Sequence, residues 1–235
     1  MSLRIGFDMD GVFADFASAF RDVEARVHGA EATLTPVQPD PGESFGVDAE
    51  PPDPAPNLYE LRRRREAVWA EIEATTDFWT TLKPIAEGAV RRLHALMLQH
   101  RWEVFFITQR PATAGETVQR QTQRWLVDQG FDYPSVLVIH GSRAAAAAAL
   151  RLDFHVDDTT QHCLDIMTGS TARTILIIGD GERIVENVRK LGIGTVSTIE
   201  EALDILEQAA GAQANPSLFK RLAALVGWQM ANGKW

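Results

Sequence analysis

Cysteine is almost absent from the chain: its 235 residues include only Cys163. A single cysteine cannot form an internal disulfide, so nothing in the sequence points to an oxidising compartment. No stretch reaches the roughly 18 apolar residues that a membrane-spanning helix needs. The N-terminus enters a strand pattern at once, without the basic stretch and apolar core of a secretion signal. We therefore expect a cytoplasmic protein that does not cross a membrane.

Positive charge is also scarce. The sequence has 23 Lys and Arg against 32 Asp and Glu, which gives a net charge of -9 and a pI near 5.2. A nucleic-acid polymer or an anionic membrane surface requires a strongly basic face, so neither is expected as the main partner. A small phosphorylated substrate remains compatible with this charge, because one local pocket can be positive on an acidic surface.

What the sequence does contain, from Pro84 onward, is a regular alternation of apolar runs and helical patterns. Runs typical of strands occur at residues 102–108, 135–140, 153–158 and 174–180, with a short one at 194–197. Helical patterns of about 10 to 15 residues separate them. Such an alternation predicts an α/β fold with a parallel sheet covered by helices on both faces. The apolar run Arg4 to Phe7 supplies the first strand.

The segment between the first and second strands interrupts this alternation. Phe13 to Val27 has apolar residues at helical spacing, and so has the segment 58–74. Between them, residues 34–57 hold seven of the eleven prolines and are expected to form a long loop. We therefore predict a small helical cap inserted into the core.

The predicted organisation has three parts. Residues 1–14 and 83–211 form the α/β core, residues 15–82 form the cap with its proline-rich loop, and residues 212–235 add a C-terminal helix. Asn215 and Pro216 are typical of a helix start. This last helix is expected to pack on the core, with a homodimer contact as the alternative.

Polar side chains follow each predicted strand. They are Asp8 and Asp10 after the first, Thr108, Gln109 and Arg110 after the second, Gly141, Ser142 and Arg143 after the third, Asp157 and Asp158 after the fourth, and Asp180 after the fifth. In an open parallel sheet these positions share one rim, where ligands bind. Clustered carboxylates repel each other unless a cation lies among them, and oxygen ligands suit Mg²⁺. Thr108, Gln109 and the arginines are then candidates for binding an anionic phosphate substrate.

The order of these motifs resembles the haloacid dehalogenase-like (HAD) phosphohydrolases. The resemblance lies in a strand ending in D-x-D-G-V, a second ending in Thr, a basic residue at a helix start and a fourth ending in D-D. It covers about Leu3 to Asp158. Within that superfamily, "FDMDGVFADF" and "DFWTTLKPIAEGAVRRLHAL" look like the 5'(3')-deoxyribonucleotidase group.

This resemblance implies hydrolysis of a phosphate monoester through an aspartyl-phosphate. Carried over by position, Asp8 is the nucleophile and Asp10 the general acid and base. Thr108 is implied to bind the transferring phosphoryl group, and Phe16 to place an aromatic ring against the base of a nucleotide. The implied Mg²⁺ site consists of Asp8, the backbone carbonyl of Asp10 and Asp158, with Asp157 beside them.

The third motif departs from the family pattern, which usually has Lys where this chain has Arg143. Arginine keeps the charge, but its planar fork does not replace a compact ammonium without rearrangement. Three interpretations stay open. Arg143 replaces the family's Lys in the site, Arg143 caps a helix at the surface, or Arg110 takes the role of that Lys. Asp180 is a second candidate for the acidic motif, but it comes one strand later than the order of motifs requires.

The predicted function is thus a Mg²⁺-dependent phosphatase of a small phosphate ester, with a nucleoside monophosphate as one candidate. The alternative is a non-catalytic descendant that binds a phosphorylated ligand, for which the missing Lys is the sole support. The hypothesis of a dehalogenase or a phosphonatase has weaker support. Dehalogenases lack the second acid, and a phosphonatase calls for a cap lysine, whereas Lys83 is the only lysine before the second strand.

Overall fold

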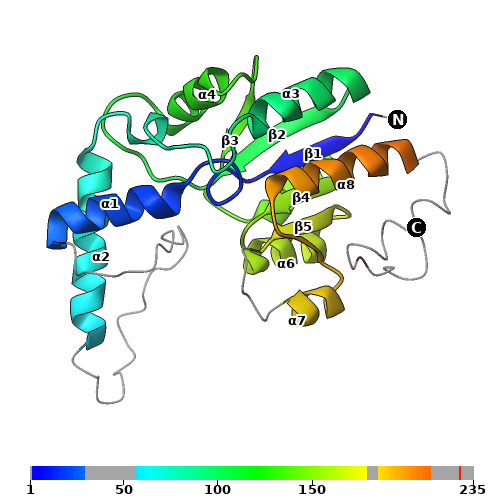
Figure 1. The fold of residues 1–235 in the computed structure, drawn as a ribbon. Coiled ribbons are helices and arrows are strands. Elements are labelled where there is room, and N and C mark those ends of the chain that lie inside the picture. The colour runs from blue at the N-terminus through cyan, green and yellow to red at the C-terminus, as the bar shows by residue number, and fades with distance from the viewer. Residues whose placement is uncertain (1, 30–56, 179–184, 213–227, 229–235) are drawn as a thin grey trace.

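The computed structural model describes residues 2–29, 57–178, 185–212 and 228. Its centre is a six-stranded, wholly parallel sheet with the strand order β3-β2-β1-β4-β5-β6 (Figure 1). The strands are β1 (Arg4–Phe7), β2 (Glu103–Thr108), β3 (Ser135–Val138), β4 (Phe154–Asp157), β5 (Arg173–Ile177) and β6 (Gly194–Val196). The strand order reverses direction beside β1, which is the place where a doubly wound sheet opens its ligand-binding crevice.

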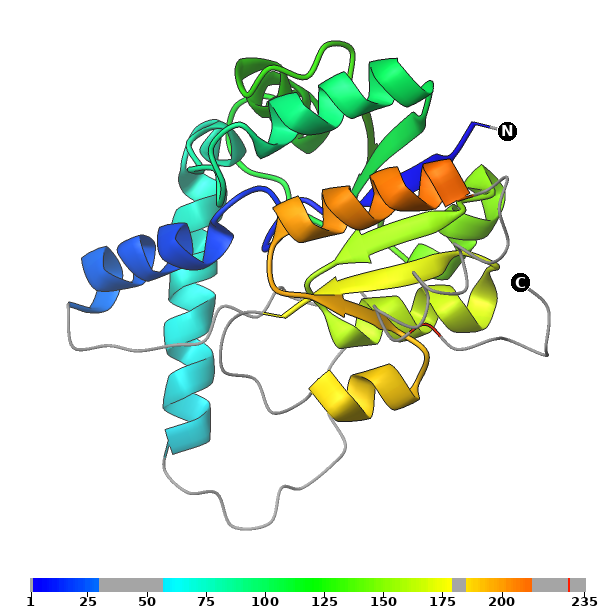
Figure 2. The same ribbon diagram turned by 45° about the vertical axis from the view of Figure 1, so that its right-hand side comes forward.

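Helices cover both faces of this sheet. The core helices are α3 (Ala89–His100), α4 (Val118–Asp128), α5 (Arg143–Leu150), α6 (Thr160–Gly169), α7 (Val185–Lys190) and α8 (Ile199–Ala212). Helices α3, α4 and α8 lie on one face, with α6 and α7 on the other (Figures 1 and 2). The side chains of β2 point alternately to these two faces. Val104 and Phe106 pack on the face covered by α3, α4 and α8, and Ile107 packs with α5 and α6 on the other. The predicted Rossmann-like α/β fold is confirmed.

The inserted segment folds as two helices to one side of the sheet, α1 (Phe16–His28) and α2 (Asn57–Ala74), which pack on each other (Figure 1). The two segments that connect these helices to the core are hydrogen-bonded to each other through their backbones. Asp15 N donates to Lys83 O at 2.8 Å, and Ile85 N donates to Phe13 O at 2.8 Å. Residues 30–56, with nearly all of the proline-rich segment, lie outside the described residues.

Trp228 is the one described residue beyond the end of α8, and it packs on the core. Trp228 is buried, its Nε1 donates to Thr174 O at 2.8 Å, and its ring lies 5.4 Å from that of Phe154. A Cβ on Gly194 would lie 2.5 Å from the indole nitrogen, so β6 needs glycine at this contact. The rest of the predicted helix over residues 212–235 lies outside the described part of the chain, apart from the end of α8.

No helix in the described ranges has both the length and the hydrophobicity needed to cross a bilayer.

Candidate active site

The turn after β1 carries the first acidic pair and is held by the backbone. Asp8 N donates to Val156 O of β4 at 2.9 Å, and both Phe13 N and Ala14 N donate to Met9 O at 2.9 Å. Helix α1 begins only at Phe16, because Asp15 caps it by accepting a hydrogen bond from Ser18 N. The predicted helical pattern from Phe13 therefore includes three residues that belong to this turn and its exit.

Gly11 makes room for an acid from another strand. Its φ is +77°, a left-handed conformation that side chains rarely adopt. A Cβ at this position would fall 1.7 Å from Asp158 Oδ2. The glycine thus serves two needs at once: it closes the turn, and it lets the carboxylate of Asp158 approach the backbone between Asp10 and Val12.

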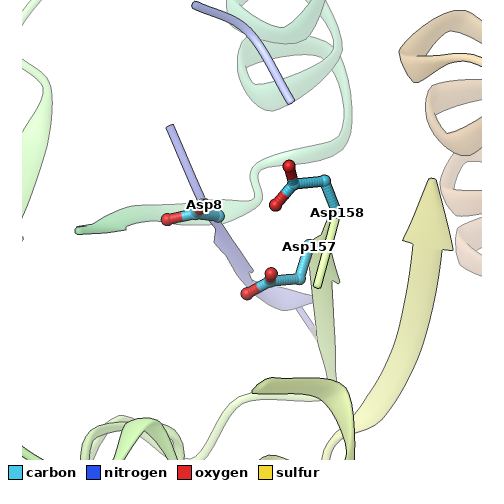
Figure 3. Close-up of side chains that lie close together, drawn as sticks. All are labelled: Asp8, Asp157 and Asp158. Carbon is cyan, nitrogen blue, oxygen red and sulfur yellow. The ribbon is translucent and has the colours of Figure 1, made fainter. Parts of the chain in front are cut away.

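Three carboxylates meet at the ends of β1 and β4 (Figure 3). One oxygen each from Asp8, Asp157 and Asp158 lies within 4.8 Å of the others, and this is the one such group among the described residues. The structure therefore brings together three of the four predicted metal-binding residues by their side chains. The side chain of the fourth, Asp10, pairs with Arg110 instead, which leaves its backbone carbonyl as the predicted ligand.

The crowding of these acids changes their proton affinity. Burial, together with the charges of Asp157 and Asp10, raises the pKa of Asp8 to about 6 although Arg143 opposes the shift. Asp158 is an exposed residue, but the protein around its carboxylate and the charges of Asp8 and Asp157 raise its pKa to about 8. Both shifts express the cost of placing like charges together without a counter-ion. A divalent cation with a preference for oxygen ligands fits this donor set.

Arg143 stands at the start of α5, and its guanidinium reaches the carboxylate cluster. Its Nη1 lies 3.0 Å from Asp8 Oδ1 and 3.6 Å from Asp157 Oδ2, and it donates to Ile107 O at 3.0 Å. The side chain is 1% exposed. The reading of Arg143 as a surface helix cap is therefore wrong, because a buried guanidinium beside two carboxylates is not a surface group.

The helix that carries Arg143 is anchored at its first turn. Ser142 caps α5 by accepting a hydrogen bond from Ala144 N, and its hydroxyl donates to Asp165 Oδ2 of α6 at 2.9 Å. Ala144 N also donates to Asp165 at 3.0 Å. These bonds fix the helix start, so that the long arginine side chain enters the cluster from a defined direction.

Asp157 is surrounded by donors. His155 Nε2 donates to its Oδ2 at 3.0 Å, while His162 Nδ1 and Thr159 N donate to its Oδ1 at 3.1 and 2.9 Å. Burial alone would raise the pKa of Asp157, but Arg143 and the two histidines hold it well below the usual range. Asp157 is thus an ionised acid whose oxygens already have partners, better suited to hold Arg143 than to move a proton.

Neither histidine is among the site residues predicted from the sequence. His155 is a fully buried residue of β4, and it also orients Asp157. His162 was not identified at all. Its position five residues after Asp157, in the first turn of α6, was the available signal, because a helix that starts at a strand end directs its first side chains back to the same rim.

Arg110 contacts Asp10, not Asp8. Its Nη2 lies 2.7 Å from Asp10 Oδ1 and its Nε 2.9 Å from Asp10 Oδ2, and its Nη1 donates to Thr122 Oγ1 at 3.0 Å. The side chain is 0% exposed. The reading in which Arg110 replaces the family's Lys is therefore not supported by the geometry, since Arg143 is the arginine beside the predicted nucleophile.

The other residues predicted from β2 lie at the same rim. Thr108 is buried, and its Oγ1 has no hydrogen-bond partner among the described residues. Gln109 is half-buried, and its Nε2 donates to Gly141 O at 3.0 Å, which ties the end of β2 to the loop that leads into α5. Asp180, the second candidate for the acidic motif, lies outside the described residues.

Phe16, predicted to contact a nucleotide base, is part of an aromatic cluster within the cap. Its ring stacks on Trp69 at 5.5 Å and lies 5.6 Å from Trp79 and 5.8 Å from Phe20. Only 5% of Phe16 is exposed. Trp79 and its neighbour Phe78 are also buried, so the structure favours packing at the base of the cap over an open aromatic surface.

Neither a protein-family model nor a curated protein matches the sequence. Solved structures do share its fold. A HAD family hydrolase from Deinococcus radiodurans R1, determined with bound phosphate and sodium, has a TM-score of 0.54 at 16% identity, over 89% of this chain and 96% of that chain. A haloacid dehalogenase-like family hydrolase from Streptococcus pneumoniae gives 0.52 at 12% identity, over 87% and 98%. A hydrolase from Pseudomonas syringae gives 0.51 at 14% identity, over 87% and 98%.

These similarities establish the fold of HAD-type hydrolases. They cover nearly the whole of each neighbour. At this level of identity they bear on the fold alone and not on the deoxyribonucleotidase group.

Proposed function

We propose that the chain is a Mg²⁺-dependent phosphatase that hydrolyses a small phosphate monoester through an aspartyl-phosphate on Asp8. The observation that carries this proposal is the pairing of Asp8 with a buried arginine inside a cluster of three carboxylates. Such a cluster of like charges is costly to fold unless a cation lies among them. The Deinococcus radiodurans hydrolase of similar fold was determined with phosphate and sodium bound, which is the combination of anion and cation that the proposal requires.

In the proposed reaction, an Asp8 oxygen attacks phosphorus and the bond from phosphorus to the ester oxygen breaks. Asp10 gives its proton to the leaving oxygen. Water then attacks the phosphorus of the aspartyl-phosphate, Asp10 takes the proton from that water, and inorganic phosphate leaves with Asp8 restored. The same carboxylate thus works as an acid in the first half and as a base in the second.

A Mg²⁺ ion bound by Asp8, Asp158 and the Asp10 carbonyl would neutralise charge between the nucleophile and the phosphate. Arg143 adds a fixed positive charge beside Asp8, since its Nη1 contacts that carboxylate directly. We assign to Arg143 the task that the resembled family gives to Lys. The unpartnered hydroxyl of Thr108 is the donor that we assign to a phosphoryl oxygen.

The proposed substrate is small, because the site lies between the sheet rim and the cap. A (deoxy)nucleoside monophosphate is the finer proposal, and it rests on the sequence resemblance alone, since Phe16 is covered by other rings. The alternative, a non-catalytic phospho-ligand-binding protein, is not favoured. A binding protein has no need for a buried acid of raised pKa beside a second acid.

The test is phosphate release from p-nitrophenyl phosphate and from a panel of nucleoside monophosphates, with Mg²⁺ and with a chelator. We expect Mg²⁺-dependent release by the wild-type protein and none by Asp8→Asn. A hydroxylamine-labile phosphoprotein should form in the wild type alone. A purified, folded protein that releases no phosphate from any of these esters would overturn the proposal, and so would an Asp8→Asn variant as active as the wild type.

A further inference from the structure

We propose that Arg110 is a positioning residue for Asp10: it fixes the orientation of that carboxylate for proton transfer and does not bind the substrate. This inference rests on the proposed phosphatase function and adds a residue to its machinery. It also replaces the role of substrate ligand that the sequence suggested for Arg110. The argument depends on three features of the structure, namely the geometry of the pair, its burial and the support of the guanidinium from behind.

The geometry is that of a two-point clamp. Arg110 Nη2 lies 2.7 Å from Asp10 Oδ1, and Arg110 Nε lies 2.9 Å from Asp10 Oδ2 and 3.2 Å from Asp10 Oδ1, so that two nitrogens contact both carboxylate oxygens. A single contact would allow the carboxylate to rotate about the bond to its Cβ. Two parallel contacts from a planar group fix its plane as well as its position.

The occupied nitrogens of Arg110 argue against a direct role in substrate binding. Its Nε and Nη2 contact Asp10 and its Nη1 donates to Thr122, whereas Thr108 Oγ1, which is equally buried, has no partner among the described residues. The Arg110 side chain is 0% exposed and that of Asp10 is 5% exposed. Asp10 retains a small exposed area and Arg110 retains none, which places the acid between the arginine and the crevice.

The guanidinium is itself held by groups on two other elements. Arg110 Nη1 donates to Thr122 Oγ1 of α4 at 3.0 Å, and the indole of Trp79 lies 4.8 Å from its Cζ. Trp79 belongs to η1 (Phe78–Thr80) at the end of the cap, and its Nε1 donates to Pro111 O at 3.0 Å. The arginine is thus a rigid support for Asp10, built from the core helix and the base of the cap.

Such a support matters because proton transfer depends steeply on placement. An acid displaced by about 1 Å can lose on the order of 100-fold in rate. Asp10 stands in the turn after β1, and its short side chain has to face the leaving oxygen in order to transfer a proton. Removing Arg110 should therefore slow the chemical step and leave substrate affinity nearly as it was.

The test is a double-mutant cycle of Asp10→Asn and Arg110→Met, with p-nitrophenyl phosphate and a simple alkyl phosphate as probes. If Arg110 acts through Asp10, R110M should lower kcat for the alkyl ester about 100-fold with little change in KM. With p-nitrophenyl phosphate, the rate of the first half-reaction, which expels the leaving group, should fall less. The reason is that p-nitrophenolate leaves without a proton. The double variant should be no slower than D10N.

Two outcomes overturn the inference while the proposed function stands. One is a raised KM with kcat preserved in R110M, which would make Arg110 a substrate ligand. The other is a double variant in which the increase in activation free energy equals the sum of the increases in the two single variants. A wild-type protein inert toward both esters overturns the proposed function, and the inference with it.

Further variants guard against loss of the fold. Thr122→Val removes one hydrogen bond to Arg110 at similar volume and should give a smaller kcat loss that disappears in the D10N background. Arg110→Lys keeps the charge without the fork, so it should recover part of the R110M loss. The control is Arg124→Met, because Arg124 forms ion pairs with Asp77 and Glu116 at the surface of α4 and should leave kcat and KM unchanged.

Discussion

The Nη1 atom of Arg143 lies 3.0 Å from the Oδ1 atom of Asp8, in a site where both side chains are almost wholly buried. The two residues lie on the start of α5 and directly after β1. The same nitrogen also donates to the carbonyl of Ile107, the next-to-last residue of β2. One guanidinium therefore links the predicted nucleophile to the neighbouring strand, and it holds the acid in place while countering its charge.

Two substitutions of Arg143 should distinguish the effect of its positive charge on activity from the effect of its planar shape. Arg143→Met leaves Asp8 and Asp157 without their shared cation, and we expect kcat to fall about 10²- to 10³-fold. Arg143→Lys supplies the ammonium of the resembled family and should retain activity within about 10-fold of the wild type. Steady-state kinetics with p-nitrophenyl phosphate measure both effects. The matched control is Arg120→Met on the surface of α4, and an R143M variant as active as that control would contradict the assignment.

Gly11 offers a second test, because Gly88 provides an unusually close control. Both glycines have positive φ, +77° and +81°, so alanine costs about 1–2 kcal/mol of backbone strain at either position. A Cβ on Gly88 meets nothing within 4 Å, whereas one on Gly11 collides with the Asp158 carboxylate. Gly11→Ala should therefore weaken Mg²⁺ binding, measured by calorimetric titration, and Gly88→Ala should not. Equal Mg²⁺ affinity in the two variants would show that Asp158 is not a ligand.

The fold was predictable because its signals are local. The hydrophobic pattern of each strand and each helix can be recognised within about ten residues. Parallel strands bring their carboxyl ends to one rim of the sheet, whatever the strand order. Asp8, Asp157 and Asp158 could for that reason be placed together from the sequence alone. The turn at Gly11 could be predicted as a close approach of backbone, although the group that approaches is Asp158.

The pairing of the arginines could not be predicted in the same way. Arg110 and Arg143 both follow strand ends, and the sequence left open which of them serves Asp8. The Asp10 contact joins residues 100 positions apart and depends on a side-chain direction that only packing against Thr122 and Trp79 decides. His162 was missed for a related reason: its ring reaches Asp157 through the angle at which α6 leaves the strand.

Trp228 tests how far the C-terminal segment stabilises the core. Trp228→Ala removes a large buried ring from Phe154 and Gly194, and we expect a loss of about 3–5 kcal/mol in the free energy of unfolding. Trp228→Phe removes the hydrogen bond to Thr174 O but keeps most of the packing, so it should cost about 1–2 kcal/mol. Urea denaturation measures both. If the two variants unfold at the wild-type midpoint, the segment contributes nothing to the core.

The raised pKa values of Asp8 and Asp158, about 6 and about 8, predict how pH and Mg²⁺ act together. In the metal-free protein the folded state holds protons that the unfolded chain releases near pH 4. The stability these groups contribute is therefore complete below about pH 4 and is lost as the pH rises through 6 and 8. Asp157, whose pKa is lowered, stays ionised across this window.

Mg²⁺ requires the ionised carboxylates, so it competes with these protons. Its apparent affinity should rise up to about 10-fold per pH unit below the pKa of each ligand, and the increase in Tm caused by a fixed Mg²⁺ concentration should be larger at pH 8 than at pH 6. Differential scanning fluorimetry at the two pH values measures this. Asp158→Asn should abolish most of the increase at both. An equal increase in the wild type at pH 6 and pH 8 would show that neither raised carboxyl binds the metal.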